Sequence, residues 1–210
     1  MPKPAPMAYR ASMATRKTTP GQSTRDKLID AAFRAVARDG LADTNVKSIA
    51  AEAGVNPGLL HYHFASKDAL LHAAVESATA RYMAEMDALM AATPRSELFD
   101  AYMDFAARTL EANRDLFRVR LALGVRAMND SEIAARLEVA NEAIRGRLAI
   151  ICAAGAGRSE VDDRDRLRAR TTKAAFEGLM LSWLTYPDFP MREALAEWAA
   201  GLRAVMRKPG

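Results

Sequence analysis

The chain has 210 residues, of which 50% are hydrophobic and 27% are charged, a composition that is ordinary for a globular protein with a sizeable core. Its one cysteine, Cys152, excludes an internal disulfide framework, and no apolar run reaches the roughly 18–20 residues that a membrane-spanning helix needs. The first residues lack the apolar segment of a secretory signal, so we expect a cytoplasmic protein without a membrane partner.

Positive charge is concentrated toward the N-terminus. Residues 1–67 hold 10 Lys or Arg and 5 Asp or Glu, whereas the rest of the chain holds 20 and 21. A basic end beside a neutral body is typical of a DNA-binding domain, although a merely solvated excess of charge would give the same counts. Residues 1–22, which are rich in Pro, Ala, Ser and Thr and contain no acid, are expected to form a disordered basic arm.

The first helix is predicted to begin at Ser23 or Thr24, either of which can cap it, and to run to Asp39. Its inner face carries apolar side chains at helical spacing, and Gly40 follows its last residue. This helix therefore opens the first folded unit of the chain.

Residues 46–53 and 57–63 are predicted to form two short helices joined by a tight turn. The first has apolar side chains at intervals of three and four, and Gly54 is expected to end it in the left-handed conformation. Asn56 is a good N-cap for the second, with Pro57 at its first helical position. This arrangement is the helix-turn-helix, whose second helix enters the major groove of DNA.

The remainder of the chain is also predicted to be helical. Ser66 caps a long fourth helix, which should end before Thr93 because Pro94 disfavours helical geometry in the residue before it. Later helices are expected over residues 96–113, 114–127, 131–154, 163–186 and 188–206. Since no alternating strand pattern occurs, we predict an all-α fold.

The residues around the helix-turn-helix resemble the N-terminal DNA-binding domain of the TetR family of transcriptional regulators, over about a quarter of the chain. The matching positions are Thr44-Asn45-Val46, Ile49-Ala50, Ala53-Gly54-Val55, Gly58, Leu60, His63-Phe64 and Ser66-Lys67. Two positions depart from the family pattern, since His61 replaces the usual Tyr and Leu59 an often found Ser or Thr. The phrases GLLHYHFASKDALL and RLALGVRAMNDSEIAARLE also look similar to the BetI-type branch.

This resemblance implies a helix-turn-helix domain over residues 23–68 and a helical effector-binding and dimerisation domain over residues 69–208. Base contacts are expected from the beginning of the second short helix, namely from Pro57, Gly58, Leu59 and Tyr62. By the resemblance, further contacts with phosphates or bases come from Thr44, Asn45, Lys47, His61 and Lys67. Simple solvation is the alternative for the two lysines.

The last two helices carry stripes that suit a four-helix dimer interface. One stripe consists of small residues at helical spacing, namely Thr171, Ala174, Ala175, Gly178 and Ser182. The other is apolar and consists of Leu195, Trp198, Ala199, Leu202 and Val205. The final helices build the homodimer in the TetR family, whereas packing within one protomer is the alternative for both stripes.

An apolar effector pocket is predicted from aromatic, methionine and arginine side chains on the central helices of the second domain. The candidates are Phe99, Tyr102, Phe105, Phe117, Arg120, Leu121, Phe176, Met180 and Trp183. One of Arg118, Arg120 and Arg126 turned inward would anchor an anionic ligand, because a buried Arg needs a partner. The alternatives are ordinary core for the apolar residues and a surface position for the arginines.

No enzymatic or metal chemistry is expected. His61 and His63 are two residues apart on a helix and point to nearly opposite sides, and no nucleophile with an assigned base can be recognised. The resemblance to the TetR family implies a homodimeric repressor that binds a palindromic operator and is released by a small-molecule effector, and we expect it to need no cofactor. The alternative is a DNA-binding factor of this fold without an effector, acting through architecture or a protein partner, and a cavity in the second domain would distinguish the two.

Overall fold

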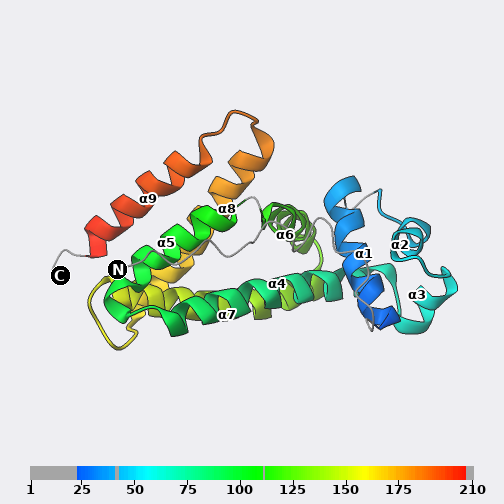
Figure 1. Ribbon diagram of the computed structural model, residues 1–210, viewed down its shortest axis with the longest axis horizontal. Coiled ribbons are helices and arrows are strands. Elements are labelled where there is room, and N and C mark those ends of the chain that lie inside the picture. Colours follow the sequence, from blue (N-terminus) through cyan, green and yellow to red (C-terminus); the bar gives the residue numbers. More distant parts are fainter. Residues whose placement is uncertain (1–22, 41–42, 111, 207–210) are drawn as a thin grey trace, which may run out of the picture.

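The computed structural model describes residues 23–40, 43–110 and 112–206, and the predicted arm over residues 1–22 lies outside them. Every regular element within these ranges is a helix, as the sequence predicts (Figure 1). The elements are α1 Thr24–Asp39, α2 Val46–Ala53, α3 Gly58–His63, α4 Lys67–Ala92, η1 Arg95–Glu97, α5 Leu98–Thr109, α6 Arg114–Ala127, α7 Ser131–Gly155, α8 Asp163–Thr185 and α9 Met191–Met206.

Side-chain caps fix where several helices begin. Ser23 accepts a hydrogen bond from the backbone N–H of Asp26 at the start of α1, and Ser66 accepts one from Ala69 at the start of α4. Asp130 caps α7, and Asp162 opens α8 with a reciprocal capping box. Each such cap satisfies an otherwise orphaned N–H and is worth about 1 kcal/mol. The predicted starts of these four helices are therefore confirmed.

The predicted helix over residues 96–113 is wrong at both ends. A 3-10 turn precedes α5, because Pro94 has an extended backbone and the first hydrogen bond, from Glu97 N to Pro94 O, is of the tighter kind. At the other end the helix stops at Thr109, whose hydroxyl donates to the carbonyl of Phe105, while the side chain of Asn113 donates to the carbonyl of Thr109. Side-chain bonds of this kind compete with continuation of the helix.

α4 connects the head, formed by α1, α2 and α3, to the body, formed by α5 to α9. It extends away from the head along the long axis of the molecule (Figure 1) and packs against α1 as well as against α5, α6 and α7. One continuous cluster of buried apolar side chains joins Leu28 and Leu60 in the head to Met86 in α4 and Ile151 in the body. Head and body thus share a core across the predicted boundary at residue 68.

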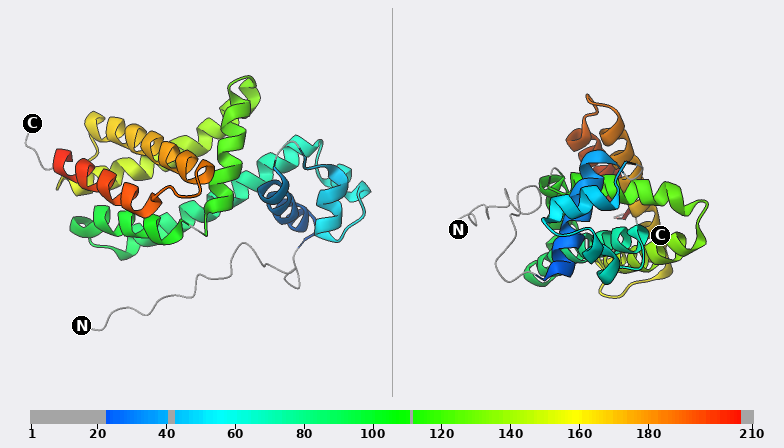
Figure 2. Two further views of the ribbon diagram at one scale, coloured as in Figure 1. Left: turned by 90° about the horizontal axis from the view of Figure 1, so that it is seen from above. Right: turned by 90° about the vertical axis from the view of Figure 1, so that its right-hand side faces the viewer.

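α6 lies across α4 between the head and the rest of the body (Figure 2). It contacts α1 of the head on one side and α7 and α8 of the body on the other. α8 and α9 close the body, where Met180, Met191 and Leu195 form a second small core with residues of α5. Through these contacts α6 touches both the head and the interior of the body.

We expect Gly155→Ala to destabilise the fold by about 1–3 kcal/mol, because overpacking forces neighbours to shift. A Cβ at this last residue of α7 would lie 3.0 Å from Cβ of Phe99 and 2.9 Å from the terminal carbon of Met206. The matched control is Gly146→Ala in the same helix, where a Cβ meets nothing within 4 Å and helix propensity favours Ala by up to about 1 kcal/mol. Urea unfolding of the two variants measures the difference, and equal stabilities would contradict the close approach of α5 and α7.

Candidate nucleic-acid interface and small-molecule cavity

The turn between α2 and α3 has the geometry that the sequence predicts. Gly54 ends α2 with φ of 66° and ψ of 36°, the left-handed conformation that glycine adopts without steric cost. The side chain of Asn56 then accepts a hydrogen bond of 2.8 Å from the backbone N–H of Gly58. α3 begins at Gly58, one residue later than predicted, and Pro57 occupies the N-cap position with helical backbone angles.

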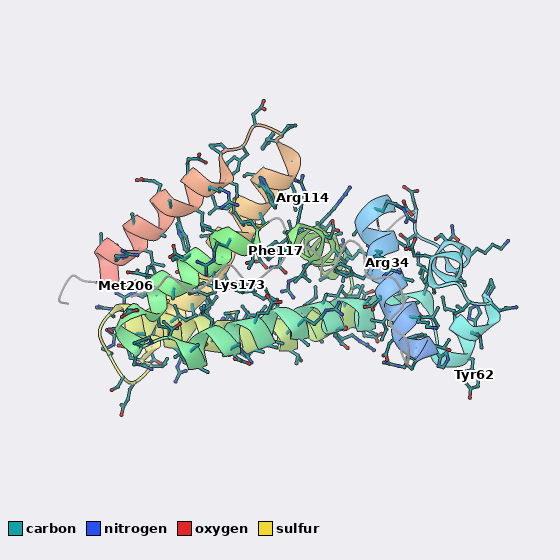
Figure 3. All side chains as sticks on the ribbon, viewed as in Figure 1. Arg34, Tyr62, Arg114, Phe117, Lys173 and Met206 are labelled. Carbon is teal, nitrogen blue, oxygen red and sulfur yellow. The ribbon has the colours of Figure 1, made fainter. Side chains whose placement is uncertain are left out.

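α3 presents an exposed face at the outer edge of the head. Tyr62 is 81% exposed and Leu59 is 39% exposed, whereas Leu60 between them is completely buried in the core. Figure 3 shows Tyr62 at the end of the molecule farthest from the body. The remaining residues predicted to contact DNA from this helix, Pro57, Gly58 and His61, are exposed as well.

Of the residues before and within α2 that were predicted to contact DNA, Asn45 and Lys47 are exposed, whereas Thr44 is buried. Asn45 caps α2 through a reciprocal capping box with Ser48, and Lys47 is exposed and takes no part in the ion pairs of the described residues. Thr44 is 1% exposed, and its hydroxyl donates to the carbonyl of Gly40. The ammonium of Lys67 donates to the carbonyl of Thr44 at 2.9 Å. The Thr44 and Lys67 side chains therefore hold the loop before α2 against the start of α4, and their contact with DNA stays a prediction.

Charged side chains also fasten α1 to α2. Arg34 and Arg38 both donate to the carboxylate of Glu52, each at 2.9 Å. The hydrogen bond from Arg34 and the one from Arg38 hold the pKa of Glu52 below its usual value. Lys47 is the one basic residue of α2, and its exposed charge is available to a partner.

The body contains a cavity bounded by all of its helices and by α4. Its empty volume is about 540 Å³ with the open mouth included. Figure 3 labels two residues of its lining, Phe117 and Lys173, in the middle of the body. The lining consists of Tyr82, Tyr102, Met103, Ala106, Phe117, Arg120, Ile144, Leu148, Thr172, Lys173, Phe176, Glu177, Leu195 and Trp198. A mostly apolar lining with a few polar groups is what a small-molecule site requires.

Four of the predicted pocket residues line this cavity, namely Tyr102, Phe117, Arg120 and Phe176. The other five do not line it, which corrects their assignment. Phe99 and Phe105 belong to the main core, where the ring of Phe105 packs 5.9 Å from that of Tyr82. Leu121, Met180 and Trp183 pack in the second core, and the guanidinium of Arg114 covers the ring of Trp183.

Ten residues of the lining were not predicted from the sequence as part of a pocket. Leu195 and Trp198 were assigned to the dimer interface, and the other eight are Tyr82, Met103, Ala106, Ile144, Leu148, Thr172, Lys173 and Glu177. Helical spacing marks such residues as inward-facing, but it does not distinguish a filled core from a cavity wall. Tyr82 and Tyr102 are fully buried and hydrogen-bond each other, and burial raises the pKa of both phenols. They therefore contribute neutral polar groups to an otherwise aromatic wall.

The predicted dimer stripe on α9 faces mostly into the protomer. Leu195 and Ala199 are 2% and 7% exposed, and Trp198 and Leu202 pack against the core, so among these residues the structure leaves Val205 exposed. On α8 the situation is the reverse, because Thr171, Ala174 and Gly178 are exposed, while Ala175 and Ser182 are half-buried.

The outward side of α8 also carries two large apolar side chains that the predicted stripe did not include. Leu167 is 61% exposed and Leu181 is 56% exposed. Together with Thr171, Ala174 and Gly178 they form what we call the α8 face. A face that combines small residues with exposed leucines is unusual on a surface that only water covers.

Three of the four arginines of α6, namely Arg118, Arg120 and Arg126, point in different directions. Arg118 donates to the carbonyl of Ala37 in α1 at 2.9 Å, and Arg126 forms a two-pronged ion pair with Asp68 at the start of α4. Arg120 is turned into the body, where it donates to the hydroxyl of Thr79 and the amide oxygen of Asn141. Arg118 and Arg126 lie about 80° apart around the helix axis, whereas Arg120 lies about 200° from Arg118. α6 thus contacts α1 of the head with Arg118, the start of α4 with Arg126 and the cavity with Arg120.

Several other chemistries have no site in the part of the chain that the structure describes. None of the helices there is long and apolar enough to cross a membrane. Within the same residues no three His, Cys, Asp or Glu side chains are grouped so that they could hold a metal ion. The single thiol, Cys152, is buried, and burial raises its pKa to about 11.

Two protein-family models match the chain. Residues 28–74 match the bacterial regulatory proteins of the tetR family, and residues 94–207 match the C-terminal domain of BetI-type transcriptional repressors. The first match contains the helix-turn-helix and the start of α4, and the second contains α5 to α9.

Individual proteins with similar sequences are also transcriptional regulators. The HTH-type transcriptional regulator BetI of Stenotrophomonas maltophilia is 34% identical over 125 residues, which are 56% of this chain and 61% of that protein, so the match spans about three-fifths of its length. BetI of Rhizobium meliloti is 29% identical over 75% of this chain and 76% of its own.

One solved structure shares the fold at low sequence identity. A transcriptional regulator from Saccharomonospora viridis, solved in complex with choline, has a TM-score of 0.70 and is 22% identical, with 84% of this chain and 95% of that chain covered. The matching families and relatives are transcriptional regulators, which are not enzymes. The chain belongs to the TetR family of bacterial transcriptional regulators, with a C-terminal domain of the BetI type.

Proposed function

We propose that this regulator represses transcription by binding a palindromic operator as a homodimer, and that a small molecule in the cavity releases it. The observation that carries this proposal is the double contact of α6. The helix lines the cavity with Phe117 and Arg120, and it contacts α1 of the head through Arg118 and the first turn of α4 through Arg126. A ligand that changes the position of α6 therefore acts directly on the head.

The exposed face of α3 contacts the bases of the operator. Tyr62, Leu59 and Gly58 extend toward solvent at the outer edge of the head, and the exposed cation of Lys47 lies at the beginning of α2. Leu59 offers an apolar contact to a thymine methyl group, and Tyr62 offers a hydroxyl and a ring. Two such heads related by a two-fold axis read two half-sites about 34–36 Å apart, or a multiple of that distance.

The α8 face is the part of the molecule that best fits a second protomer. Gly178 and Ala174 allow the two α8 helices to approach closely, and Leu167 and Leu181 supply apolar area that a partner would remove from water. Val205 of α9 adds another exposed apolar side chain, so we assign the interface to α8 with the exposed side of α9. A two-fold interface of this kind brings each residue against the same surface of the partner.

A change of ligand state reaches the head by way of α6 and α4. Arg126 clamps α6 to the first turn of α4, and its hydrogen bond holds the pKa of Asp68 below the usual value. The ligand acts only to the extent that it prefers the conformation whose heads are wrongly spaced for the operator. The cavity favours this effector-controlled regulator over a factor that acts without a small molecule. The neighbour solved in complex with choline gives choline a place in any first panel of ligands.

The first test of this proposal concerns DNA. We expect Tyr62→Ala to weaken operator binding by about 1–3 kcal/mol, the worth of one good base contact, and Lys47→Ala to weaken it with a smaller slope against salt concentration. Arg108→Ala, which removes an exposed cation from α5 in the body, is the matched control for the lost charge. Fluorescence anisotropy with the upstream DNA of the gene at several salt concentrations measures all three, and parental affinity in both head variants would refute the docking of α3.

The second test concerns assembly. Gly178→Arg is expected to convert the dimer into a monomer, because the new charge would be buried without a partner at the interface. A Cβ at Gly178 meets nothing within 4 Å in the protomer, so the protomer itself tolerates the change. Gly146→Arg on α7, where the space is equally open, serves as the control that stays dimeric. Sedimentation velocity at micromolar concentration separates the outcomes, and a parental protein that sediments as a monomer would exclude the interface altogether.

The third test concerns transmission. In the double variant Arg118→Met with Arg126→Met, the contacts of α6 with Ala37 and Asp68 are lost, whereas the cavity lining is unchanged. We expect ligand affinity close to that of the parent and a ligand-induced loss of operator affinity that is at least about tenfold smaller, since only coupling has been removed. Gel shifts across a panel of choline, amines and carboxylates identify the ligand, and calorimetry measures its affinity. An unchanged release in the double variant would place the coupling elsewhere.

A further inference from the structure

We propose that the cavity selects an organic anion with an apolar body, whose anionic group pairs with the guanidinium of Arg120. This proposal rests on the proposed function of the cavity as the effector site, and it names the chemical class of the effector. An anion is the opposite charge class from choline, which the structural neighbour holds.

Both hydrogen-bond acceptors of Arg120 are uncharged. Its guanidinium donates to the hydroxyl of Thr79 at 3.1 Å and to the amide oxygen of Asn141 at 2.6 Å, and both acceptors are neutral. None of the ion pairs among the described residues includes Arg120. A guanidinium has five N–H donors, so two hydrogen bonds leave capacity for the two-pronged contact that suits a carboxylate or phosphate.

The charges of the lining support the same conclusion. Arg120, Lys173 and Glu177 are its ionic side chains, and the ammonium of Lys173 donates to the carboxylate of Glu177 one turn further along α8. Glu177 also attracts Arg120 at longer range, but its hydrogen bond goes to Lys173, and the residue as a whole is exposed. Two cations and one anion leave the cavity with a net positive charge, and burial without a counterion is costly.

A cation in this cavity would meet Arg120 without a second carboxylate in the lining to balance it. An anion near Arg120 instead compensates a charge that the protein has already buried. The buried hydroxyl of Thr172 is a further donor in the lining, and its Oγ1 has no partner in the described residues apart from the thiol of Cys152.

The rest of the lining determines the body of the ligand. Five aromatic side chains, Tyr82, Tyr102, Phe117, Phe176 and Trp198, line the cavity together with five aliphatic ones. The ring of Phe117 packs edge to face against those of Tyr82 and Phe176, at 6.2 and 5.4 Å between centroids. Such a wall takes up a phenyl ring or an alkyl chain by apolar contact, while it offers few hydrogen-bond partners to a sugar or a peptide.

The test compares three probes that share one apolar body and differ in charge, namely phenylbutyrate, phenylbutanol and phenylbutylamine. Calorimetry on the full-length protein should rank their affinities as carboxylate, alcohol and amine, from tightest to weakest. In Arg120→Met the carboxylate should lose roughly tenfold to hundredfold in affinity, the range expected for a hydrogen bond to a charged group, while the alcohol stays within about twofold of the parent. Arg108→Met removes an exposed arginine of α5 outside the lining and should change none of the affinities.

The comparison among probes in the parent decides the question even if Arg120→Met folds poorly. Tighter binding of the amine, equal binding of all three probes, or no binding of any at millimolar concentration would overturn the proposal. Operator release is measured separately by gel shift with the same probes. A carboxylate that binds through Arg120 without releasing DNA would contradict the proposed effector control and leave the ligand class established, so the two failures can be distinguished.

Discussion

The burial of one side of α4 is the constraint on which the rest of the structure depends. Leu70 near its beginning packs in the same cluster as Leu28 and Leu60 of the head, while Met86 further along is completely buried among residues of the body. Each fully buried side chain of this kind contributes about 1.5–3 kcal/mol relative to an exposed one. The head therefore cannot separate from the body without exposing a core that both share.

Most helices could be predicted because residues close in the sequence determine where each helix begins and ends. Ser23, Ser66, Asp130 and Asp162 cap helices at the positions where the sequence places them, and Gly54 adopts the left-handed conformation that ends α2. Such signals depend on a few neighbouring residues. The exposed side chains of α3 could be predicted for the same reason, because the turn and the buried Leu60 fix the orientation of this short helix.

The cavity could be predicted only in part, because it depends on which inward-facing side chains leave space between helices that are distant in the sequence. Tyr102 and Phe117 line it, whereas Phe105, which has the same character and lies one turn from Tyr102, fills the core. The sequence also did not show whether the wide apolar stripe of α9 packs within the protomer or against a second one. Leu195 and Trp198 complete the wall of the cavity, and a stripe alone does not tell an internal partner from an external one. Likewise, Thr44 has the polarity of a surface residue, but its buried hydroxyl is satisfied within the chain.

The hydrogen bond from Lys67 to the carbonyl of Thr44 couples any rotation of α4 to the helix-turn-helix. It ties the first residue of α4 to the residue just before the cap of α2, so the helix-turn-helix and α4 turn together. α4 has 26 residues and is therefore about 39 Å long. A tilt of about 5° over that length displaces the far end by about 3 Å, close to the rise of one base pair. Under the proposed function, a rotation of α4 by a few degrees would therefore move the helix-turn-helix along its operator by about one base pair.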